Sequence, residues 1–219
     1  MPPAIRKDLV LLFALAIFVA GTPLDLGVRA AAQNAPANCV EPARPSLASS
    51  SGPRGIPNFG LVNPNLFRGG QPSTDGYREL RQMGVEIVVS FRHEKGENSL
   101  EQRTVESLGM RFVSFPWKAW DSPADADVQR FFALLAANPR AKIFLHCQQG
   151  RDRTGAMVAV YRIAVDRWCP ESAVAEMKAY HYHHFFFPQL ETYVESFPDR
   201  LAKNRGFASA LNPPASSNP

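Results

Sequence analysis

A short turn at residues 146–155 carries the residue types that phosphate chemistry needs. It reads HCQQGRDRTG and follows the apolar run IFL at 143–145. Cys147 and Arg153 are separated by five residues with Gly150 among them, and a loop of that length at a helix start can aim successive backbone N–H groups at one centre. The positive end of the following helix points the same way. The turn therefore predicts a cradle for a tetrahedral phosphate dianion; the plain alternative is a basic surface loop after a strand.

The same turn supplies a candidate nucleophile. A free thiol has a pKa of about 8.5, and helix N-termini and nearby cations lower the pKa of such a thiol. We therefore expect Cys147 to attack as a thiolate, which needs no general base, so that His146 would serve to orient the loop. Arg153 can hold two phosphate oxygens with one planar fork. Thr154 can donate its hydroxyl to the sulfur and ease its later departure.

Alternating strands and helices must position this turn. Such alternation implies parallel strand pairing with right-handed crossovers. We expect an α/β fold with a small, mostly parallel twisted sheet flanked by helices on both faces. Ligands of such sheets bind at the carboxyl ends of the strands, where the turn lies. Strands are predicted at 65–68, 85–91, 110–115 and 142–145, and helices at 73–84, 98–108, 123–135, 154–165, 171–180 and 190–194.

The overall composition suits one soluble globular domain. The chain has 219 residues, of which 45% are hydrophobic, and its mean hydropathy is −0.19. The net charge of +4 is spread along the chain, and no block of Lys and Arg stands out. We therefore expect no nucleic-acid partner. The expected partner is a phosphorylated substrate, and the expected state is a monomer.

The N-terminus predicts export. Arg6 and Lys7 precede an apolar run over 9–20, and small residues follow at 30–32, which is the pattern of a secretory signal. The apolar run is shorter than the roughly 20 residues that span a bilayer core. We expect cleavage of 1–32, a periplasmic or secreted protein, and no stable membrane insertion after cleavage. An uncleaved N-terminal anchor is the alternative.

The remaining chain is divided by composition, and its cysteines bear on its compartment. Residues 33–57 are rich in Pro, Ala, Ser and Gly and predict a linker; 58–203 predict the catalytic domain, and 204–219 a disordered tail.

The three cysteines all follow the predicted signal, an odd number for a compartment that favours disulfides. Cys39 could pair with Cys169 and leave Cys147 free, and the sequence leaves that pairing open.

The turn also fits the signature of a known family. His146-Cys147, Gly150 and Arg153-Thr154-Gly155 match HC-x-x-G-x-x-R-[ST]-G, so the chain resembles the dual-specificity branch of the cysteine-dependent protein tyrosine phosphatases. Residues 63–92 resemble the start of an atypical bacterial, fungal and plant group, and the likeness extends over about 57–200. Rhodanese-like sulfurtransferases are the nearest confusable class, but they have a shorter cysteine loop and lack the R-[ST]-G ending.

The resemblance implies a role for each residue of the turn. Cys147 would form a phosphocysteine, and Arg153 would bind the phosphate and stabilise the transition state, without a metal or other cofactor. The substrate would be a phosphorylated protein or an inositol phosphate; the remaining alternative is a phosphate-binding module without turnover. The residues expected to surround the phosphate are Gln148, Gln149, Gly150, Arg151, Asp152 and Arg153.

The resemblance further implies a general acid on the loop after the third strand. The candidates in WDSPADADV are Asp121, Asp125 and Asp127. Ser122-Pro123 looks like an N-cap followed by a first-turn proline, which would place the two later aspartates inside a helix and leave Asp121 outside it. We therefore prefer Asp121. The family's more familiar position falls nearer Ala119, which cannot donate a proton.

Asp152 is a further candidate. An aspartate just before the signature arginine resembles phosphatases that act on phosphoinositides and some bacterial phosphatases of broad specificity, where it has been considered an acid or a brace of the phosphate loop. The alternative is a solvent-facing carboxylate paired with Arg151 or Arg103.

Three other features have structural explanations. The stretch HYHHFFF at 181–187 is expected to be a loop between helices, with its aromatic residues packed on the core and a place at the border of the cleft, rather than a metal site. Trp117 and Trp120 are expected to pack the acid loop down, or one of them to stack on substrate. Arg68, which belongs to the family-like stretch, is expected to form a structural salt bridge.

Overall fold

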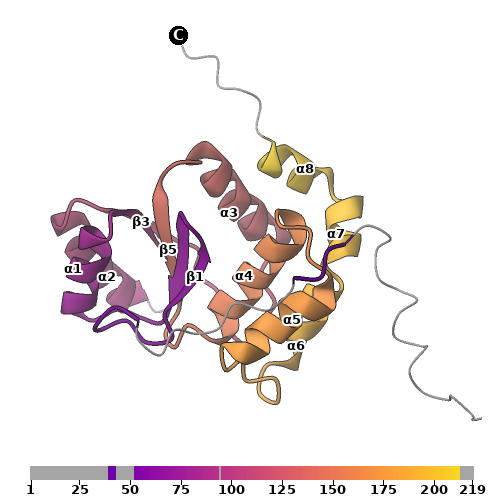
Figure 1. The fold of residues 1–219 in the computed structure, drawn as a ribbon, viewed down its shortest axis with the longest axis horizontal. Coiled ribbons are helices and arrows are strands. Elements are labelled where there is room, and N and C mark those ends of the chain that lie inside the picture. The colour runs from indigo at the N-terminus through magenta and orange to yellow at the C-terminus, as the bar shows by residue number, and fades with distance from the viewer. Residues whose placement is uncertain (1–38, 43–51, 94, 213–219) are drawn as a thin grey trace, which may run out of the picture. The chain divides into compact units, whose positions relative to one another are not determined.

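A computed structural model describes residues 39–42, 52–93 and 95–212 (Figure 1). The predicted signal, most of the predicted linker and the last seven residues of the predicted tail lie outside the described residues. Of the helices in the described part, none is long and apolar enough to cross a membrane.

The core of the fold is a five-stranded sheet with the order β1-β2-β5-β3-β4. β1 and β2 pair antiparallel, and the other neighbours are parallel, as predicted. β5 therefore lies in the middle of the sheet and leads directly into the turn that carries Cys147. The strands are β1 (Gly60–Asn63), β2 (Leu66–Gly69), β3 (Val85–Ser90), β4 (Arg111–Ser114) and β5 (Lys142–His146).

Helices cover both faces of this sheet (Figure 1). α1 and α2 pack on one face through a small apolar cluster, and the later helices pack on the other through a larger one. α4 is buried almost all round, which explains its nearly continuous apolar sequence. The helices are α1 (Thr74–Gln82), α2 (Lys95–Ser107), α3 (Asp125–Ala137), α4 (Asp152–Ala164), α5 (Pro170–Ala179), α6 (Pro188–Glu195), α7 (Phe197–Lys203) and α8 (Arg205–Leu211).

The sheet and helix pattern confirms the predicted α/β class, but the starts of two helices differ from the prediction. α2 begins at Lys95, three residues before the predicted start at 98. α3 begins at Asp125 with Ala124 as its N-cap, two residues later than the Ser-Pro pattern predicted.

Residues 205–211, which belong to the predicted disordered tail, form α8. Phe207 of this helix is fully buried, with ring centroids 6.3 Å from Phe132 and 5.3 Å from Phe197. One aromatic residue among small side chains was too weak a periodic signal to predict the helix. At the other end, Ile56 of the predicted linker is buried in the α1–α2 cluster.

A disulfide joins Cys39 to Cys169, at the loop between α4 and α5, so the pairing that the sequence left open is present. The main chain reinforces it: Val40 donates to the carbonyl of Arg167 at 2.7 Å and accepts from the N–H of Cys169 at 3.1 Å. Part of the predicted linker is therefore fixed to the domain. Cys147 is the free thiol.

Candidate active site

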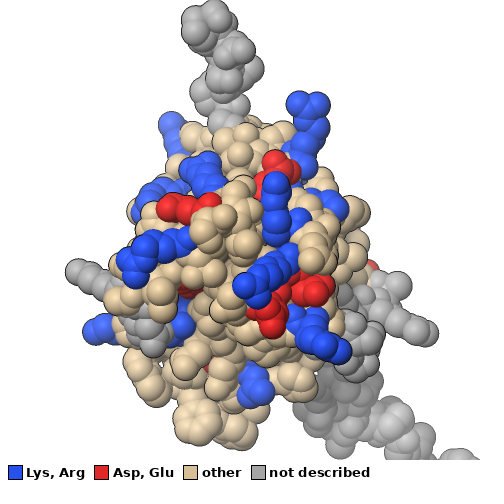
Figure 2. Space-filling view, turned by 90° about the vertical axis from the view of Figure 1, so that its left-hand side faces the viewer, with Lys and Arg blue, Asp and Glu red and all other residues tan. Residues whose placement is uncertain are grey.

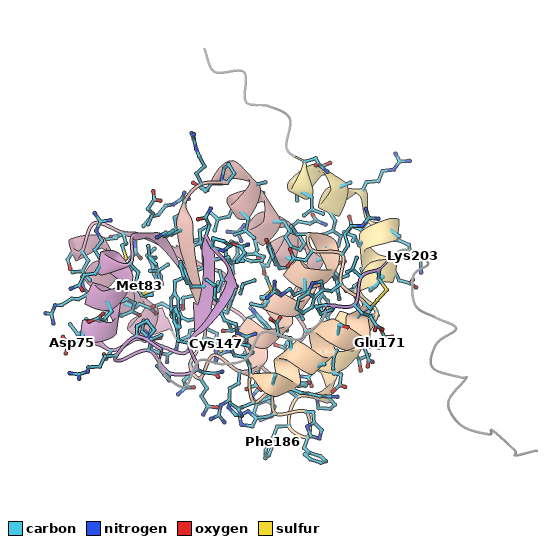
Figure 3. All side chains as sticks on the ribbon, in the orientation of Figure 1. Asp75, Met83, Cys147, Glu171, Phe186 and Lys203 are labelled. Carbon is cyan, nitrogen blue, oxygen red and sulfur yellow. A yellow bond between two sulfur atoms is a disulfide. The ribbon has the colours of Figure 1, made fainter. Side chains whose placement is uncertain are left out.

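The segment 147–151, which we call the cysteine loop, connects the carboxyl end of β5 to the N-terminus of α4. Gly150 adopts a φ of 72°, and a Cβ there would lie 2.3 Å from the backbone carbon of Gly69. Only glycine therefore fits where the loop crosses the end of β2. Figure 3 shows Cys147 at this end of the strands.

A cavity of about 370 Å³ lies against Cys147, whose side chain is buried at its inner end. Four segments line it: the residue range after β3, the loop between β4 and α3, the cysteine loop with the first turn of α4, and the loop between α5 and α6. Of the residues predicted to surround the phosphate, Gln148, Gln149, Asp152 and Arg153 line this cavity with the thiol, whereas Gly150 and Arg151 do not. The lining residues are His93, Ala119, Trp120, Cys147, Gln148, Gln149, Asp152, Arg153, His183, Phe186 and Phe187.

Arg153 is held in a fixed position at this cavity. Its Nη1 donates to the carbonyl oxygens of Phe91 at 3.1 Å and Trp117 at 3.2 Å, and lies 3.4 Å from Nδ1 of His93. All three contacts use the same nitrogen. Within the described residues the rest of the guanidinium has no protein partner, so its fork is available to two oxygens of a phosphate.

Thr154 lies one residue further along α4 and is fully buried. Its hydroxyl oxygen has no hydrogen-bond partner among the described residues. A buried hydroxyl without a partner is costly. The placement is compatible with donation to the sulfur, the role expected from sequence.

His146 orients the start of the loop, and its acidic partner was missed in the sequence. Nδ1 of His146 lies 3.2 Å from the carbonyl oxygen of Cys147. Nε2 lies 2.6 Å from Oε1 of Glu101, close but without an aligned hydrogen bond. Burial alone would raise the pKa of Glu101, but the contacts with His146 and the hydroxyl of Tyr77 outweigh burial and lower the pKa of this carboxyl.

Asp152, Arg151 and His183 form a second network at the cavity. The Asp152 carboxylate accepts from the main-chain N–H of His183 at 2.9 Å and lies 3.1 Å from its Nδ1. Nε2 of the same ring lies 2.9 Å from Nη1 of Arg151. The network ties the loop between α5 and α6 to the cysteine loop. Asp152 is therefore not a solvent-facing carboxylate paired with Arg151 or Arg103.

The aspartates of the predicted acid loop lie away from the cavity lining. Asp121 is exposed and does not line the cavity, whereas Ala119 does. Asp125 accepts from the hydroxyl of Tyr193 at 3.1 Å and pairs with Arg200 at 3.3 Å. Asp127 pairs with Arg130 on α3. Of the four carboxylates considered as the general acid, only Asp152 therefore lines the cavity.

The aromatic residues beside the cavity differ from their expected packing. Phe185 and Phe186, expected to pack on the core, are 86% and 67% exposed. Trp120 is also exposed, and its ring lies 4.8 Å from that of Phe187, while Trp117 is buried. Figure 3 shows Phe186 projecting from the same end of the domain as Cys147, and Figure 2 shows that this end, at its lower edge, carries few charged side chains.

Two other features do not add a ligand site. Within the described residues, no group of three or more His, Cys, Asp or Glu side chains is placed to hold a metal ion. A second cavity of about 300 Å³ lies beside β1 and α3, but its polar side chains Asn63 and Tyr161 bond to each other at 2.8 Å.

Comparison with known proteins matches this geometry to a family. The model of the DSP-PTPase phosphatase domain fused to NAD⁺ kinase matches residues 55–193. The dual specificity protein phosphatase TpbA of Pseudomonas aeruginosa is 32% identical over 171 residues, which is 78% of this chain and 70% of that protein. The dual specificity protein phosphatase 26 of Bos taurus is 29% identical and spans 53% of this chain and 56% of its own length.

Solved structures share the fold. The crystal structure of P. aeruginosa TpbA has a TM-score of 0.60 and 27% identity, and covers 72% of this chain and 96% of its own. A cysteine-to-serine variant of that protein in complex with pTyr has a TM-score of 0.59 and 24% identity, and covers 74% of this chain and 100% of its own. The catalytic core of the PP-IP phosphatase SIW14 of S. cerevisiae, at 14% identity, has a TM-score of 0.55 and covers 69% of this chain and 96% of its own.

Proposed function

The chain belongs to the dual-specificity branch of the cysteine-dependent protein phosphatases, and on that premise we propose that it is an exported enzyme that hydrolyses phosphotyrosine in proteins through a phosphocysteine on Cys147. The observation that carries the substrate class is the cavity wall. The aromatic rings of Trp120, Phe186 and Phe187 form an apolar surface between the Cys147 thiol and solvent. Such a wall suits the aromatic ring of phosphotyrosine.

In the first step, the Cys147 thiolate attacks phosphorus. An S–P bond forms as the ester O–P bond breaks, and the free fork of Arg153 holds two of the equatorial oxygens as charge develops on them. The N-terminus of α4 and the amides of the cysteine loop face the same oxygens. In the second step, water attacks phosphorus, inorganic phosphate leaves, and the sulfur departs as a thiolate that accepts a hydrogen bond from Thr154.

The leaving oxygen needs a proton in the first step, and we assign it to the pair formed by Asp152 and His183. Both line the cavity, and the Asp152 carboxylate lies 3.1 Å from Nδ1 of His183, so a proton held between them lies at the cavity wall. The assignment replaces Asp121, which does not line the cavity. Water then returns a proton to the pair in the second step.

Export is supported by the disulfide as well as by the N-terminal pattern. Disulfides persist in oxidising compartments and are rare in the cytosol, and the bond between Cys39 and Cys169 joins residues 130 apart in sequence. We therefore propose a periplasmic or secreted location, with cleavage after the predicted signal. Sizing the N-terminus of protein recovered from the periplasm by mass spectrometry tests this; a mature chain that still begins at Met1 would contradict cleavage.

The substrate class can be tested by comparing kcat/KM on a phosphotyrosine peptide, a matched phosphoserine peptide and an inositol phosphate. We expect the phosphotyrosine peptide to be preferred. Phe186→Ala should lower its kcat/KM about fivefold, because an aromatic contact is worth roughly 1 kcal/mol. Phe185→Ala is the matched control, since Phe185 is also exposed and does not line the cavity.

Two outcomes would contradict the substrate proposal. The first is a preference for the inositol phosphate that is lost in Arg151→Ala. That result would mean that Arg151 binds additional phosphate groups of the substrate beside the cavity. The second is an equal effect of the two phenylalanine variants. In each case, the loss of all phosphate release in Cys147→Ser verifies that the measured activity belongs to this site.

A further inference from the structure

A buried guanidinium lies behind the cysteine loop. Arg68 on β2 is 0% exposed, and its Nη2 donates to the carbonyl oxygen of Gly150 at 3.0 Å. Its guanidinium carbon lies 3.7 Å from the ring centroid of Tyr180. Nε and Nη1 have no hydrogen-bond partner among the described residues. Because buried polar groups are normally satisfied, two unused donors on a fully buried cation are a costly arrangement.

The salt bridge expected for Arg68 is not formed. Glu176 has the largest charge effect on Arg68, but both of its oxygens accept from Arg162, at 2.8 and 3.0 Å. No carboxylate in the described part of the chain lies within ion-pair distance of Arg68. A positive charge that is not neutralised by a direct partner therefore sits on the side of the cysteine loop away from the cavity.

Arg68 also fixes the orientation of one peptide plane in the loop. The carbonyl of Gly150 accepts from Nη2 of Arg68 and from Nδ2 of Asn58, both at 3.0 Å. In a trans peptide the carbonyl and the next N–H point in opposite directions. With the Gly150 oxygen drawn back toward Arg68, the N–H of Arg151 points to the other side, where the cavity lies.

The charge of Arg68 also reaches the thiol. Burial lowers the pKa of Arg68 to about 10, partly opposed by Glu176 and by Tyr180 and Cys147 in their ionised forms. The guanidinium thus remains charged at neutral pH. Since attraction between two groups is mutual, a guanidinium that is favoured by a thiolate at Cys147 also favours that thiolate.

We propose that Arg68 is a positioning residue of the phosphatase reaction: it turns a loop amide toward the phosphate and stabilises the Cys147 thiolate from behind the loop. The inference rests on the proposed role of Cys147 as nucleophile. It explains why an arginine, rather than an apolar residue, occupies a fully buried position on a central-sheet strand.

Two readouts that do not depend on turnover test the proposal. The first is the rate at which iodoacetamide alkylates Cys147 as a function of pH, which follows the thiolate population. The second is the affinity for vanadate, which follows the phosphate cradle. In Arg68→Met, a neutral side chain of similar length, we expect alkylation at pH 6 to slow by on the order of tenfold, as loss of one nearby charge implies. Vanadate should bind at least about tenfold more weakly.

Asn58→Gly is the matched control, because it removes the uncharged donor to the same carbonyl oxygen, and glycine suits the φ of 51° at that position. We expect it to weaken vanadate binding by a smaller factor and to leave the alkylation profile in place. Arg68→Lys, which keeps the charge without the planar fork, should alkylate at nearly the wild-type rate and still bind vanadate weakly.

Each outcome decides the proposal. Wild-type alkylation and vanadate affinity in a folded Arg68→Met protein, with folding checked by circular dichroism, would overturn it. An equal slowing of alkylation in Asn58→Gly would overturn the charge effect. If Arg68→Met does not fold, slow alkylation of Cys147 in folded Arg68→Lys would likewise overturn the charge effect. Hydrolysis of an aryl phosphate by wild type but not by Cys147→Ser tests the nucleophile separately, so failure of one proposal is not failure of the other.

Discussion

The inner part and the outer part of the catalytic cavity are built differently. The inner part, which comprises His146, Cys147, Arg153 and Thr154, is buried, and main-chain oxygens hold its charged groups in place. The outer part, with Trp120 and Phe186, is exposed and lies on loops. The buried inner part is therefore preorganised for the reaction. The outer part, which contacts the substrate, can change without disturbing the inner part.

The largest expected effect tests the inner part. Arg153→Lys should lower kcat/KM by about 10²–10³, because a lysine cannot reproduce both the carbonyl contacts and the fork toward two phosphate oxygens. Steady-state kinetics on an aryl phosphate measures it. Arg130→Lys on the exposed face of α3 is the control. A loss below about fivefold would mean that Arg153 does not act on the phosphate.

A second prediction concerns the border between the two parts. Asp152→Asn should lower kcat on an alkyl phosphate by about 10²-fold and on an aryl phosphate much less, since an aryl leaving group needs little help from an acid. Asp121→Asn, measured beside it, should leave both rates near wild type. The reverse pattern, with Asp121→Asn selective for the alkyl phosphate, would return the acid to the loop before α3.

A third prediction concerns the support beneath the inner part. Glu101→Gln removes the buried charge beside His146 and should lower kcat by on the order of tenfold by loosening the start of the cysteine loop. Because the folded state lowers the pKa of Glu101, its charge stabilises the fold above the ordinary value of 4.5, and that stabilisation is lost as pH falls through the lowered pKa.

Chemical denaturation at two pH values measures this stability difference. The free energy of unfolding of Glu101→Gln should be lower than that of wild type by about 1–3 kcal/mol at pH 7. This difference should disappear on acidification below the lowered pKa of Glu101. Glu106→Gln, an exposed change on the same helix, is the control. A gap that is the same at both pH values would show that the charge of Glu101 is not its source.

The smallest expected effect tests the outer part. Trp120→Ala should raise KM for a phosphotyrosine peptide about threefold and leave kcat on a small aryl phosphate within twofold, since one exposed aromatic contact is worth under about 1 kcal/mol. The split between KM and kcat is the measurement. A drop in kcat for both substrates would show that the two parts of the cavity are not independent.

The inner part could be predicted from sequence because it is local. The spacing of Cys147, Gly150 and Arg153 fixes a loop between a strand and a helix, and the strand predictions at 85–91 and 142–145 agree with β3 and β5 to within one residue. Contacts between distant segments left no such pattern. Glu101 reaches His146 from α2, and His183 reaches Asp152 from 31 residues away.

The incorrect predictions have physical causes. Ser122-Pro123 has the composition of a helix start, but the helix begins only at Asp125, where the carboxylate is taken by Tyr193 and Arg200 from the far end of the chain. Arg68 was expected to find a carboxylate, and its burial behind the cysteine loop depends on a sheet order that is not local in sequence.

The disulfide has a consequence for the lifetime of the enzyme under oxidative stress. The chain has three cysteines, and with Cys39 and Cys169 joined, Cys147 has no second thiol in its own chain. If peroxide converts its sulfur to a sulfenic acid, no internal cysteine can condense with it and protect it from further oxidation. Recovery of the enzyme then depends on a thiol supplied by another molecule.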